Sequence, residues 1–80
     1  MKVRVNGIYR HYKGDLYLIV DVARHSETLE EMVIYRGLYE NAPLWVRPME
    51  LFVAKLDPAK QRVGLEQEWV FEPQEIESKR

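Results

Sequence analysis

Short runs of apolar residues recur along this chain, and turn residues separate them. The longest run, residues 16–23 (LYLIVDVA), is rich in the β-branched and aromatic side chains that are typical of strands. Directly before it, Gly14 can supply the left-handed backbone of a hairpin turn. Because both faces of this run are apolar, the pattern predicts a strand that is covered on both sides, as in a barrel or a sandwich.

The same pattern predicts strands on either side of this run. The predicted strands cover residues 3–12, residues 32–39 after a polar loop, and residues 44–47, where Pro48 ends the strand. Proline at its start favours one helical turn over residues 48–52. We therefore predict a mainly β protein, a small SH3-like barrel of about five strands with at most one short helical turn.

The strongest apolar runs also predict which side chains are buried. The expected core residues are Leu18, Val20, Val22, Val33, Tyr35, Val46 and Phe52. A later apolar patch, Trp69-Val70-Phe71, could close the barrel, cover a sheet edge or be buried in a homodimer. We expect one domain over residues 1–72, followed by a polar tail over residues 73–80.

Composition and charge narrow the function classes. A chain of 80 residues buries only about 60% of the surface that its unfolded form exposes, so the core is small. Twelve Lys and Arg residues oppose thirteen Asp and Glu residues, which argues against binding nucleic acid through general electrostatics. A local basic patch stays open, because most of the arginines fall in the β-rich part.

Cysteine is absent from the sequence, which excludes disulfide bonds, thiol nucleophiles and cysteine-ligated zinc. No run approaches the roughly 18 apolar residues that cross a bilayer, and charges interrupt the N-terminal segment where a signal peptide would be apolar. We therefore expect a cytoplasmic protein that does not bind membranes.

Four blocks of sequence, followed by Phe52, resemble a family of short bacterial proteins that is classed as a domain of unknown function. The blocks are GIYRHYKG (residues 7–14), VARHSET (22–28), VIYRGLY (33–39) and LWVRP (44–48). They span more than half of the chain in the order of the family. The resemblance implies an SH3-like β-barrel character and a bacterial cytoplasmic origin, and it carries over no activity.

Arginines in or at the ends of the predicted strands are the most suggestive polar residues. A guanidinium group can form two parallel hydrogen bonds to phosphate or carboxylate, and a strand fixes its direction. Because strand ends often gather around one mouth of a small barrel, several of these side chains are expected to form one partly exposed positive cluster. The predicted ligand-binding residues are Arg24, His25, Arg36 and Arg47, with Ser26 and Trp45 beside them.

A structural role is the alternative for these arginines, and it is the more common one on sheets. In that case they pair across strands with carboxylates and pack their stems on aromatic rings. The acidic residues placed for such pairs are Asp21, Glu27, Glu30 and Glu50.

Metal binding and catalysis are not favoured. The spacing of His11 and His25 matches no metal-binding pattern, and the arginine before each histidine would repel a cation. Ser26, His25 and Asp21 do not suit a hydrolytic site, because neighbouring residues in a strand point to opposite faces. We predict no catalytic residue, no metal site and no cofactor.

Two function classes remain. The first is a non-catalytic binding module for a peptide, a protein or a nucleic-acid segment, with a groove along residues 22–39 and the turn at Trp45. The alternative is a site for a small anionic ligand, a phosphate or a nucleotide, with or without an enzymatic step. We prefer the binding module because no nucleophile, base and orienting group occur together. The partner's identity and a homodimer stay open.

Overall fold

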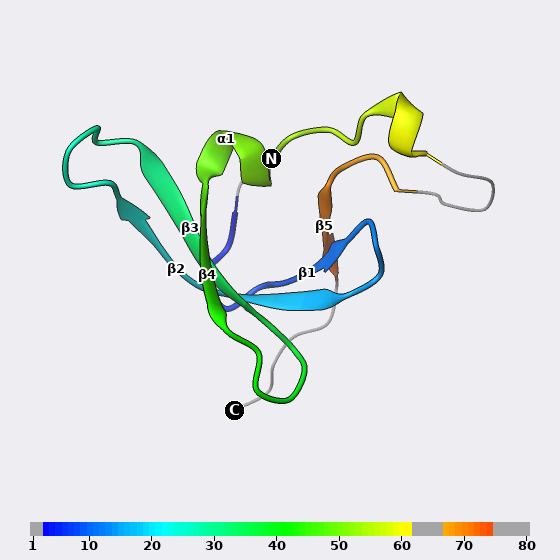
Figure 1. Cartoon of the computed structure of the whole chain (residues 1–80), viewed down its shortest axis with the longest axis horizontal. Helices are drawn as coiled ribbons and strands as arrows, with labels where there is room; N and C mark the ends of the chain where they lie inside the picture. The colour runs from blue at the N-terminus through cyan, green and yellow to red at the C-terminus, as the bar shows by residue number, and fades with distance from the viewer. Residues whose placement is uncertain (1–2, 62–66, 75–80) are drawn as a thin grey trace.

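Five short strands form one antiparallel sheet in the computed structural model, which describes residues 3–61 and 67–74 (Figure 1). The strands are β1 (Ile8–His11), β2 (Leu16–Arg24), β3 (Glu31–Gly37), β4 (Leu44–Pro48) and β5 (Phe71–Gln74). Their order in the sheet is β4-β3-β2-β1-β5, and no pairing among the described residues joins β4 to β5. The mainly β fold with five strands is therefore confirmed, and closure into an SH3-like barrel stays a prediction.

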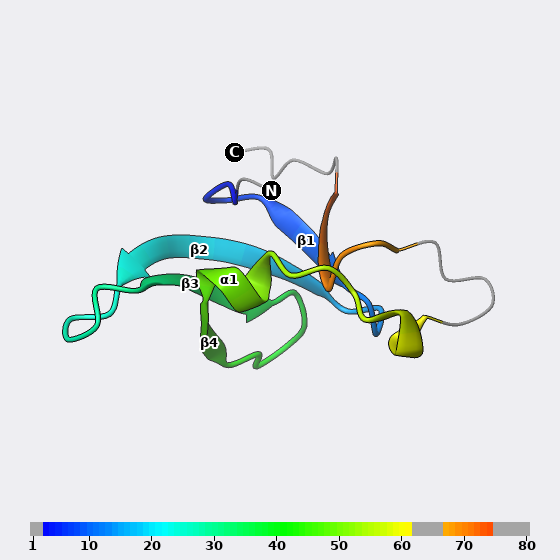
Figure 2. The ribbon, with the colours of Figure 1, turned by 90° about the horizontal axis from the view of Figure 1, so that it is seen from above.

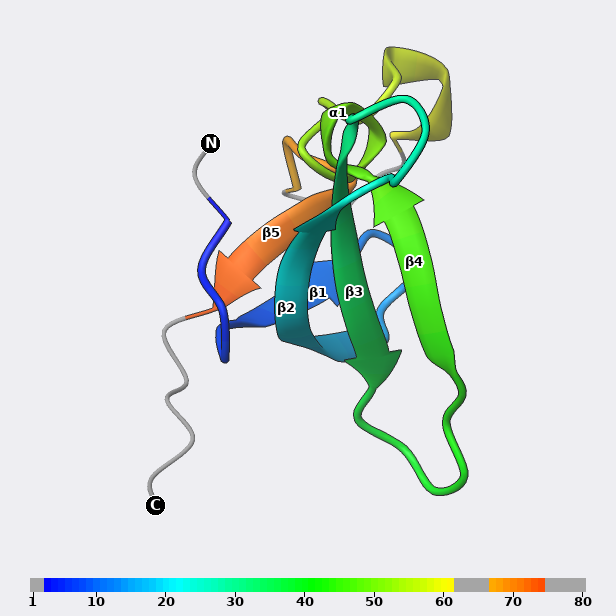
Figure 3. The same cartoon turned by 90° about the vertical axis from the view of Figure 1, so that its left-hand side faces the viewer.

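Two short helical turns follow β4. The helix α1 (Met49–Phe52) begins after Pro48, whose fixed φ of −55° is already suitable for a helix start. The expected turn over residues 48–52 is thus confirmed. The expected limit of one turn is wrong, because Pro58 begins a second one, the 3₁₀ turn η1 (Pro58–Lys60), where the Asp57 side chain accepts from the Ala59 N–H. Figure 3 shows α1 at one end of the sheet, between β4 and β5.

An irregularity in β2 bends the sheet. The pairing with β3 shifts between Ile19 and Asp21, so Val20 is an extra residue in the strand. Val20 is 39% exposed, whereas Ile19 is fully buried. The predicted burial of Val20 is therefore wrong, because a β-bulge turns its side chain away from the core. Figure 2 shows the resulting curvature along β2.

The core lies on one face of this bent sheet and is mainly aromatic. Its buried side chains are Tyr9, Ile19, Val33, Tyr35, Phe52 and Phe71. The rings of Phe52 and Phe71 are stacked, with their centroids 4.2 Å apart, and Tyr35 meets both of them edge-on. Burial of Val33, Tyr35 and Phe52 was predicted correctly, and Leu18 and Val22 are half-buried.

The opposite face of β4 has no cover among the described residues. Trp45 and Arg47 pair with Tyr35 and Val33 on the core face, so Val46 points to the other side. Val46 is 61% exposed, and its predicted burial is wrong. A strand at a sheet edge, with one open face, cannot bury both sets of its side chains.

The C-terminal apolar patch covers the edge of β1. Phe71 is buried and pairs with His11, and the isolated bridge between Lys55 and Trp69 holds the segment before it. The buried side chain of Gln67 donates from Nε2 to the Arg10 carbonyl at 3.0 Å, which adds a cross-strand link. Of the three roles weighed for this patch, the structure shows edge coverage. In the expected tail, residues 73 and 74 belong to β5, and residues 75–80 lie outside the described part.

Candidate functional site

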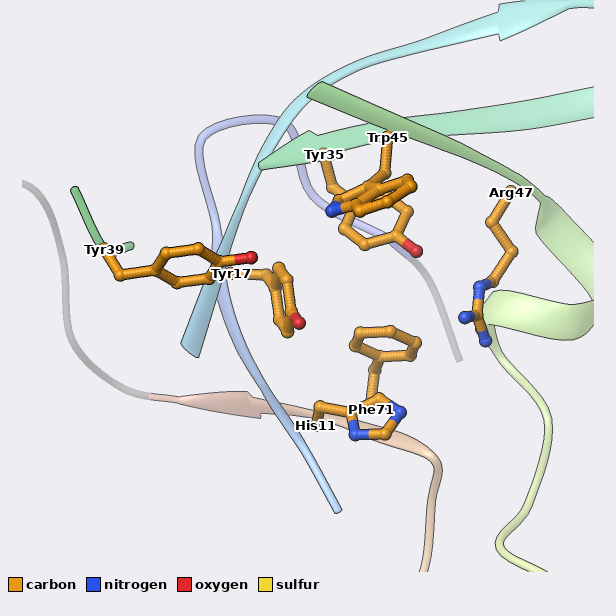
Figure 4. A pocket seen from close by; sticks show the side chains of 7 residues that line it. All are labelled: His11, Tyr17, Tyr35, Tyr39, Trp45, Arg47 and Phe71. Carbon is orange, nitrogen blue, oxygen red and sulfur yellow. The ribbon is translucent and has the colours of Figure 1, made fainter. Parts of the chain in front are cut away.

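An open cavity of about 250 Å³ lies beside the core, on the same face of the sheet (Figure 4). We call it the aromatic pocket. Its lining residues are His11, Tyr17, Tyr35, Tyr39, Trp45, Arg47 and Phe71. Tyr35 and Phe71 are buried and form its floor, whereas Trp45 and Tyr39 are 48% and 49% exposed at its rim. The pocket therefore combines a fixed floor with aromatic walls that a ligand can reach.

Strand pairing explains why these rings meet. Tyr35 lies opposite Trp45 in the pairing of β3 with β4, so both side chains stand on the core face. Tyr17 lies opposite Gly37 in the pairing of β2 with β3. Gly37 has no side chain, and the ring of Tyr39 occupies the space where one would be. Two tyrosines from different segments are thus brought to one wall of the pocket.

Ring-to-ring contacts hold the walls in place. Tyr17 meets Tyr35 edge-on, with centroids 5.4 Å apart, and meets Phe71 in the same way at 5.8 Å. His11 meets Phe71 edge-on at 4.9 Å. Edge-to-face pairs at these separations are favourable because the positive edge of one ring faces the negative face of the other. The floor of the pocket and the wall formed by Tyr17 and His11 are therefore shaped before any ligand arrives.

Arg47 carries the only formal charge of the lining at neutral pH. Its guanidinium carbon lies 5.1 Å from the centroid of the Phe71 ring, and Figure 4 shows the group turned toward the pocket. Over residues 3–61 and 67–74, the side chain of Arg47 has neither an ion pair nor a hydrogen bond. None of the seven lining residues is a carboxylate. Since none of the described residues forms an ion pair with it, the guanidinium can pair with an anion that enters the pocket.

His11 is the second polar group of the pocket, and its ring is neutral at pH 7. Burial lowers its pKa from 6.5, and the nearby charges of Arg47, Lys13 and Lys60 lower it further, whereas Asp15 raises it. Its Nδ1 accepts a hydrogen bond from the backbone N–H of Lys13 at 3.1 Å. Since Nδ1 is an acceptor, Nε2 carries the proton of the neutral ring and is a hydrogen-bond donor.

Tyr17 adds a neutral phenol to the lining. Burial raises its pKa above 10.0, and the neighbouring Tyr39 and Asp15 act in the same direction. The phenol is therefore protonated at neutral pH and can donate a hydrogen bond. Neutral rings and one cation make up the chemistry of this pocket.

The structure places two of the six predicted ligand-binding residues, Trp45 and Arg47, in the aromatic pocket. Three others, Arg24, His25 and Ser26, lie at the far end of β2 and in the turn that follows it. Arg24 donates from Nη1 to the Leu29 carbonyl at 3.1 Å. The Nδ1 of His25 accepts a hydrogen bond from the backbone N–H of Glu27, also at 3.1 Å. These contacts shape the turn.

Arg36 lies apart from both groups. It pairs with Leu18 and Leu44, on the face of the sheet opposite to Tyr35 and Arg47. The four residues of the expected positive cluster are thus not brought together. The alternative of cross-strand ion pairs is not seen either, since none of these arginines is ion-paired within the described parts of the chain.

Sequence reasoning missed most of the aromatic lining. Strand alternation could have placed Trp45 and Arg47 on one face of β4, because residues i and i+2 of a strand share a face. The link to Tyr35 needs the register between β3 and β4. The glycine at position 37 was a signal for a close approach by another side chain. No local signal marks His11 and Phe71, which meet only because β5 pairs with β1.

A second cavity of about 380 Å³ is lined by acidic and aliphatic side chains and has no aromatic ring in its lining. Its lining residues are Glu30, Glu31, Met49, Glu50 and Val53.

No group of three or more histidine or acidic side chains in the described segments is placed to hold a metal ion. None of the described helices is long and apolar enough to cross a membrane.

Fold and pocket together define a small antiparallel β domain with an aromatic pocket on one face of its sheet. Residues 7–64 match the family model described as "Protein of unknown function (DUF1653)", which is well over half of the chain. The chain belongs to this family. The expected resemblance to a domain of unknown function is thereby confirmed at the level of the family.

A solved structure from the same family supports the fold. It is described as the crystal structure of a protein belonging to DUF1653 from Bordetella bronchiseptica. It shares 36% sequence identity with this chain, covers 89% of this chain and 86% of its own, and superimposes with a TM-score of 0.69. None of the curated proteins matches this chain.

Proposed function

We propose that this protein is a non-catalytic binding module whose aromatic pocket holds one planar group of a peptide, protein or nucleic-acid partner. The observation that carries the proposal is the pocket itself, with a fixed floor of rings, exposed rings at its rim and a guanidinium that forms no ion pair or hydrogen bond with the described residues. The SH3-like character expected from the sequence belongs to the same proposal, since short antiparallel strands bend around one aromatic face.

The size of the pocket supports capture of a single group. Sites for whole small molecules typically measure about 300–1,000 Å³. A cavity of about 250 Å³ suits one ring or one side chain better than a complete cofactor. The remainder of a longer partner would then lie on the surface outside, as in domains that bind extended segments.

The charge of the pocket supports a ring that is linked to an anion. Aromatic faces alone attract cations as well as planar groups. Here Arg47 repels a cation, and the lining has no carboxylate to compensate for that repulsion. An anionic group next to the bound ring would instead form charge-assisted hydrogen bonds with the guanidinium.

The composition of the lining supports binding without catalysis. It contains no serine, threonine, cysteine or carboxylate that could act as a nucleophile beside His11. The second candidate, a site for a small anionic ligand, is favoured by one specific observation: the guanidinium of Arg47 has no ion pair and no hydrogen bond within the described residues. Both candidates use the same pocket.

Chemical-shift mapping with benzenesulfonate tests the proposal, because this probe is a ring with a charge that does not change with pH. We expect shifts of the Trp45 indole N–H and of the Tyr17 and Tyr39 amides. Inorganic sulfate has the anion without a ring, and benzamidine has a ring with a cation, so both should cause smaller shifts.

Two variants serve as controls for this experiment. Trp45→Ala should abolish saturable binding, whereas Leu51→Ala, at a residue that is 54% exposed on α1 and outside the pocket, should leave it unchanged. If benzenesulfonate does not shift the pocket resonances of the parent protein, or if it binds equally well to Trp45→Ala, the proposed function is wrong.

A further inference from the structure

We infer that the partner is a single-stranded nucleic acid, which places one base in the aromatic pocket and runs from there across His11 and Tyr12 toward Lys60. This inference rests on the proposed function and adds the chemical class of the partner. It is carried by the arrangement of rings and cations next to the pocket.

Rings and cations form a continuous series beside the pocket, which we call the ring–cation band. The guanidinium carbon of Arg47 lies 5.1 Å from the Phe71 centroid, and the His11 ring lies 4.9 Å from that of Phe71. The rings of His11 and Tyr12 are 4.5 Å apart. The Nζ of Lys60 lies 5.8 Å from the Tyr12 centroid and ends the series.

A row of rings with a cation at each end matches what a single strand presents. Proteins that bind single strands use exposed rings, on which bases stack, together with cations that follow the phosphates. In the ring–cation band, Arg47 and Lys60 lie at the two ends and the rings of His11 and Tyr12 lie between them. Stacking on rings works with every base, so the band predicts weak sequence preference.

Charge around His11, in the middle of the band, is mainly positive although the whole chain has a formal net charge of −1. After burial, the largest influences on the pKa of His11 are Arg47 and Lys13, with Lys60 acting in the same direction and only Asp15 against them. Glu30 and Glu31 line the second cavity instead, at the end of the sheet where β2 turns into β3. Asp57 caps the turn that carries Lys60, and Glu72 follows Phe71 in β5, so acidic residues also occur near the band. The cations around His11 therefore reduce the objection that the overall balance raised against nucleic acid.

A peptide is the competing macromolecule. It could fill the pocket with one aromatic side chain and place one carboxylate on Arg47. Its backbone is neutral, however, so it provides no regular anions for both Arg47 and Lys60. The spaced cations of the band therefore favour a phosphate backbone over a peptide.

Fluorescence anisotropy with a labelled oligothymidylate of about 12 nucleotides tests the inference, since single-strand sites commonly cover about 4–16 nucleotides. We expect the single strand to bind at least about 10-fold more tightly than thymidine monophosphate. It should also bind more tightly than a duplex of equal length, whose bases are not free to stack. Trp45→Ala should weaken binding by about 5- to 150-fold, the usual range for loss of one base–aromatic stack.

Charge variants locate the path of the strand. Arg47→Gln and Lys60→Gln should each weaken binding and reduce the slope of log affinity against log salt by about 0.7, as expected when one phosphate contact to a single strand is lost. Arg10→Gln is the matched control. Arg10 is exposed and adjacent to His11 in β1, but its side chain points to the opposite face.

Several results would overturn the inference. Benzenesulfonate shifts in the pocket without oligothymidylate binding would refute the inference and leave the proposed function intact, whereas absence of both would refute both. Equal affinity for thymidine monophosphate and the oligonucleotide would refute the path beyond the pocket. So would an Arg10→Gln effect as large as that of Arg47→Gln, and tighter binding of a Trp- and Glu-containing peptide would assign the pocket to a peptide partner.

Discussion

The ring of Tyr39 packs against the backbone of Gly37, two residues earlier in the chain. A Cβ at position 37 would lie 2.7 Å from both Cδ2 and Cζ of that ring, closer than real side chains approach one another. The absence of a side chain at Gly37 therefore sets the position of Tyr39 at the rim of the aromatic pocket.

Gly37→Ala should damage the pocket without unfolding the protein. Tyr39 is half-exposed, so its ring can swing away from the new methyl group at little cost to the core. We expect benzenesulfonate affinity to fall by about 2- to 10-fold, which corresponds to loss of an aromatic contact of roughly 0.5–1.5 kcal/mol. NMR titration provides the affinity, and far-UV circular dichroism checks that the fold is retained.

A double-mutant cycle with Tyr39→Ala identifies the cause. If alanine at position 37 acts by displacing the Tyr39 ring, the double variant should bind no more weakly than Tyr39→Ala alone. Additive losses would show that Gly37 contributes in some other way.

Phe52→Ala should be strongly destabilising, whereas Val20→Ala should not. The Phe52 ring is fully buried, stacks on Phe71 and meets Tyr9 edge-on at 5.5 Å. Removing it should lower the free energy of unfolding by about 3–5 kcal/mol, as measured by urea denaturation. Val20 lies at the bulge and is largely outside the core, so its truncation should cost less than about 1 kcal/mol.

These two residues also show how far the fold could be predicted from the sequence. Both lie in strong apolar runs, and such runs predicted β2, β3, β4 and one helical turn. The first predicted strand, residues 3–12, is longer than β1, and β5 was not predicted as a strand. The bulge at Val20 has no local marker such as glycine, so an uninterrupted alternation gave the wrong face there. Equal losses in Phe52→Ala and Val20→Ala would mean that the bulge does not hold in solution.

The candidate site was less predictable because long-range pairing forms it. Trp45 and Arg47 were identified from their residue types and their positions in a short strand. Arg24 and Arg36 were grouped with Arg47 by their positions near strand ends. Arg24 lies next to the turn of the β2–β3 hairpin, however, and Arg36 lies at the other end of that hairpin. Phe71 completes the pocket floor only after β5 pairs with β1, and no spacing rule brings these distant segments together.

His11 should make the stability of the protein depend on pH. Burial and the nearby cations lower its pKa in the folded state, so the unfolded chain binds a proton more readily. This contribution to stability is complete above the unfolded pKa of about 6.5 and is lost as the pH falls through the lower folded value.

NMR titration of the His11 ring protons checks this directly, and a midpoint at or above 6.5 would contradict it. Urea denaturation between pH 5 and pH 8 should show stability falling toward the acid end. In His11→Gln, which keeps a polar side chain but cannot titrate, the part of this fall that belongs to His11 should disappear.

Folding lowers the pKa of His11, whereas binding of an anionic ligand should raise it. An anion that sits beside Arg47 offsets the positive charge that disfavours protonation of His11, so bound benzenesulfonate should raise the pKa of His11. By linkage, affinity should then rise as the pH falls through the pKa of His11, by roughly fivefold, which is about 1 kcal/mol and typical of a partly exposed charge pair. The same titration on two variants assigns the effect. His11→Gln should bind with little pH dependence, and His25→Gln, altered at the far turn, should behave like the parent protein. If His25→Gln removes the pH dependence and His11→Gln keeps it, the anion binds at the turn between β2 and β3, and the aromatic pocket is not the site.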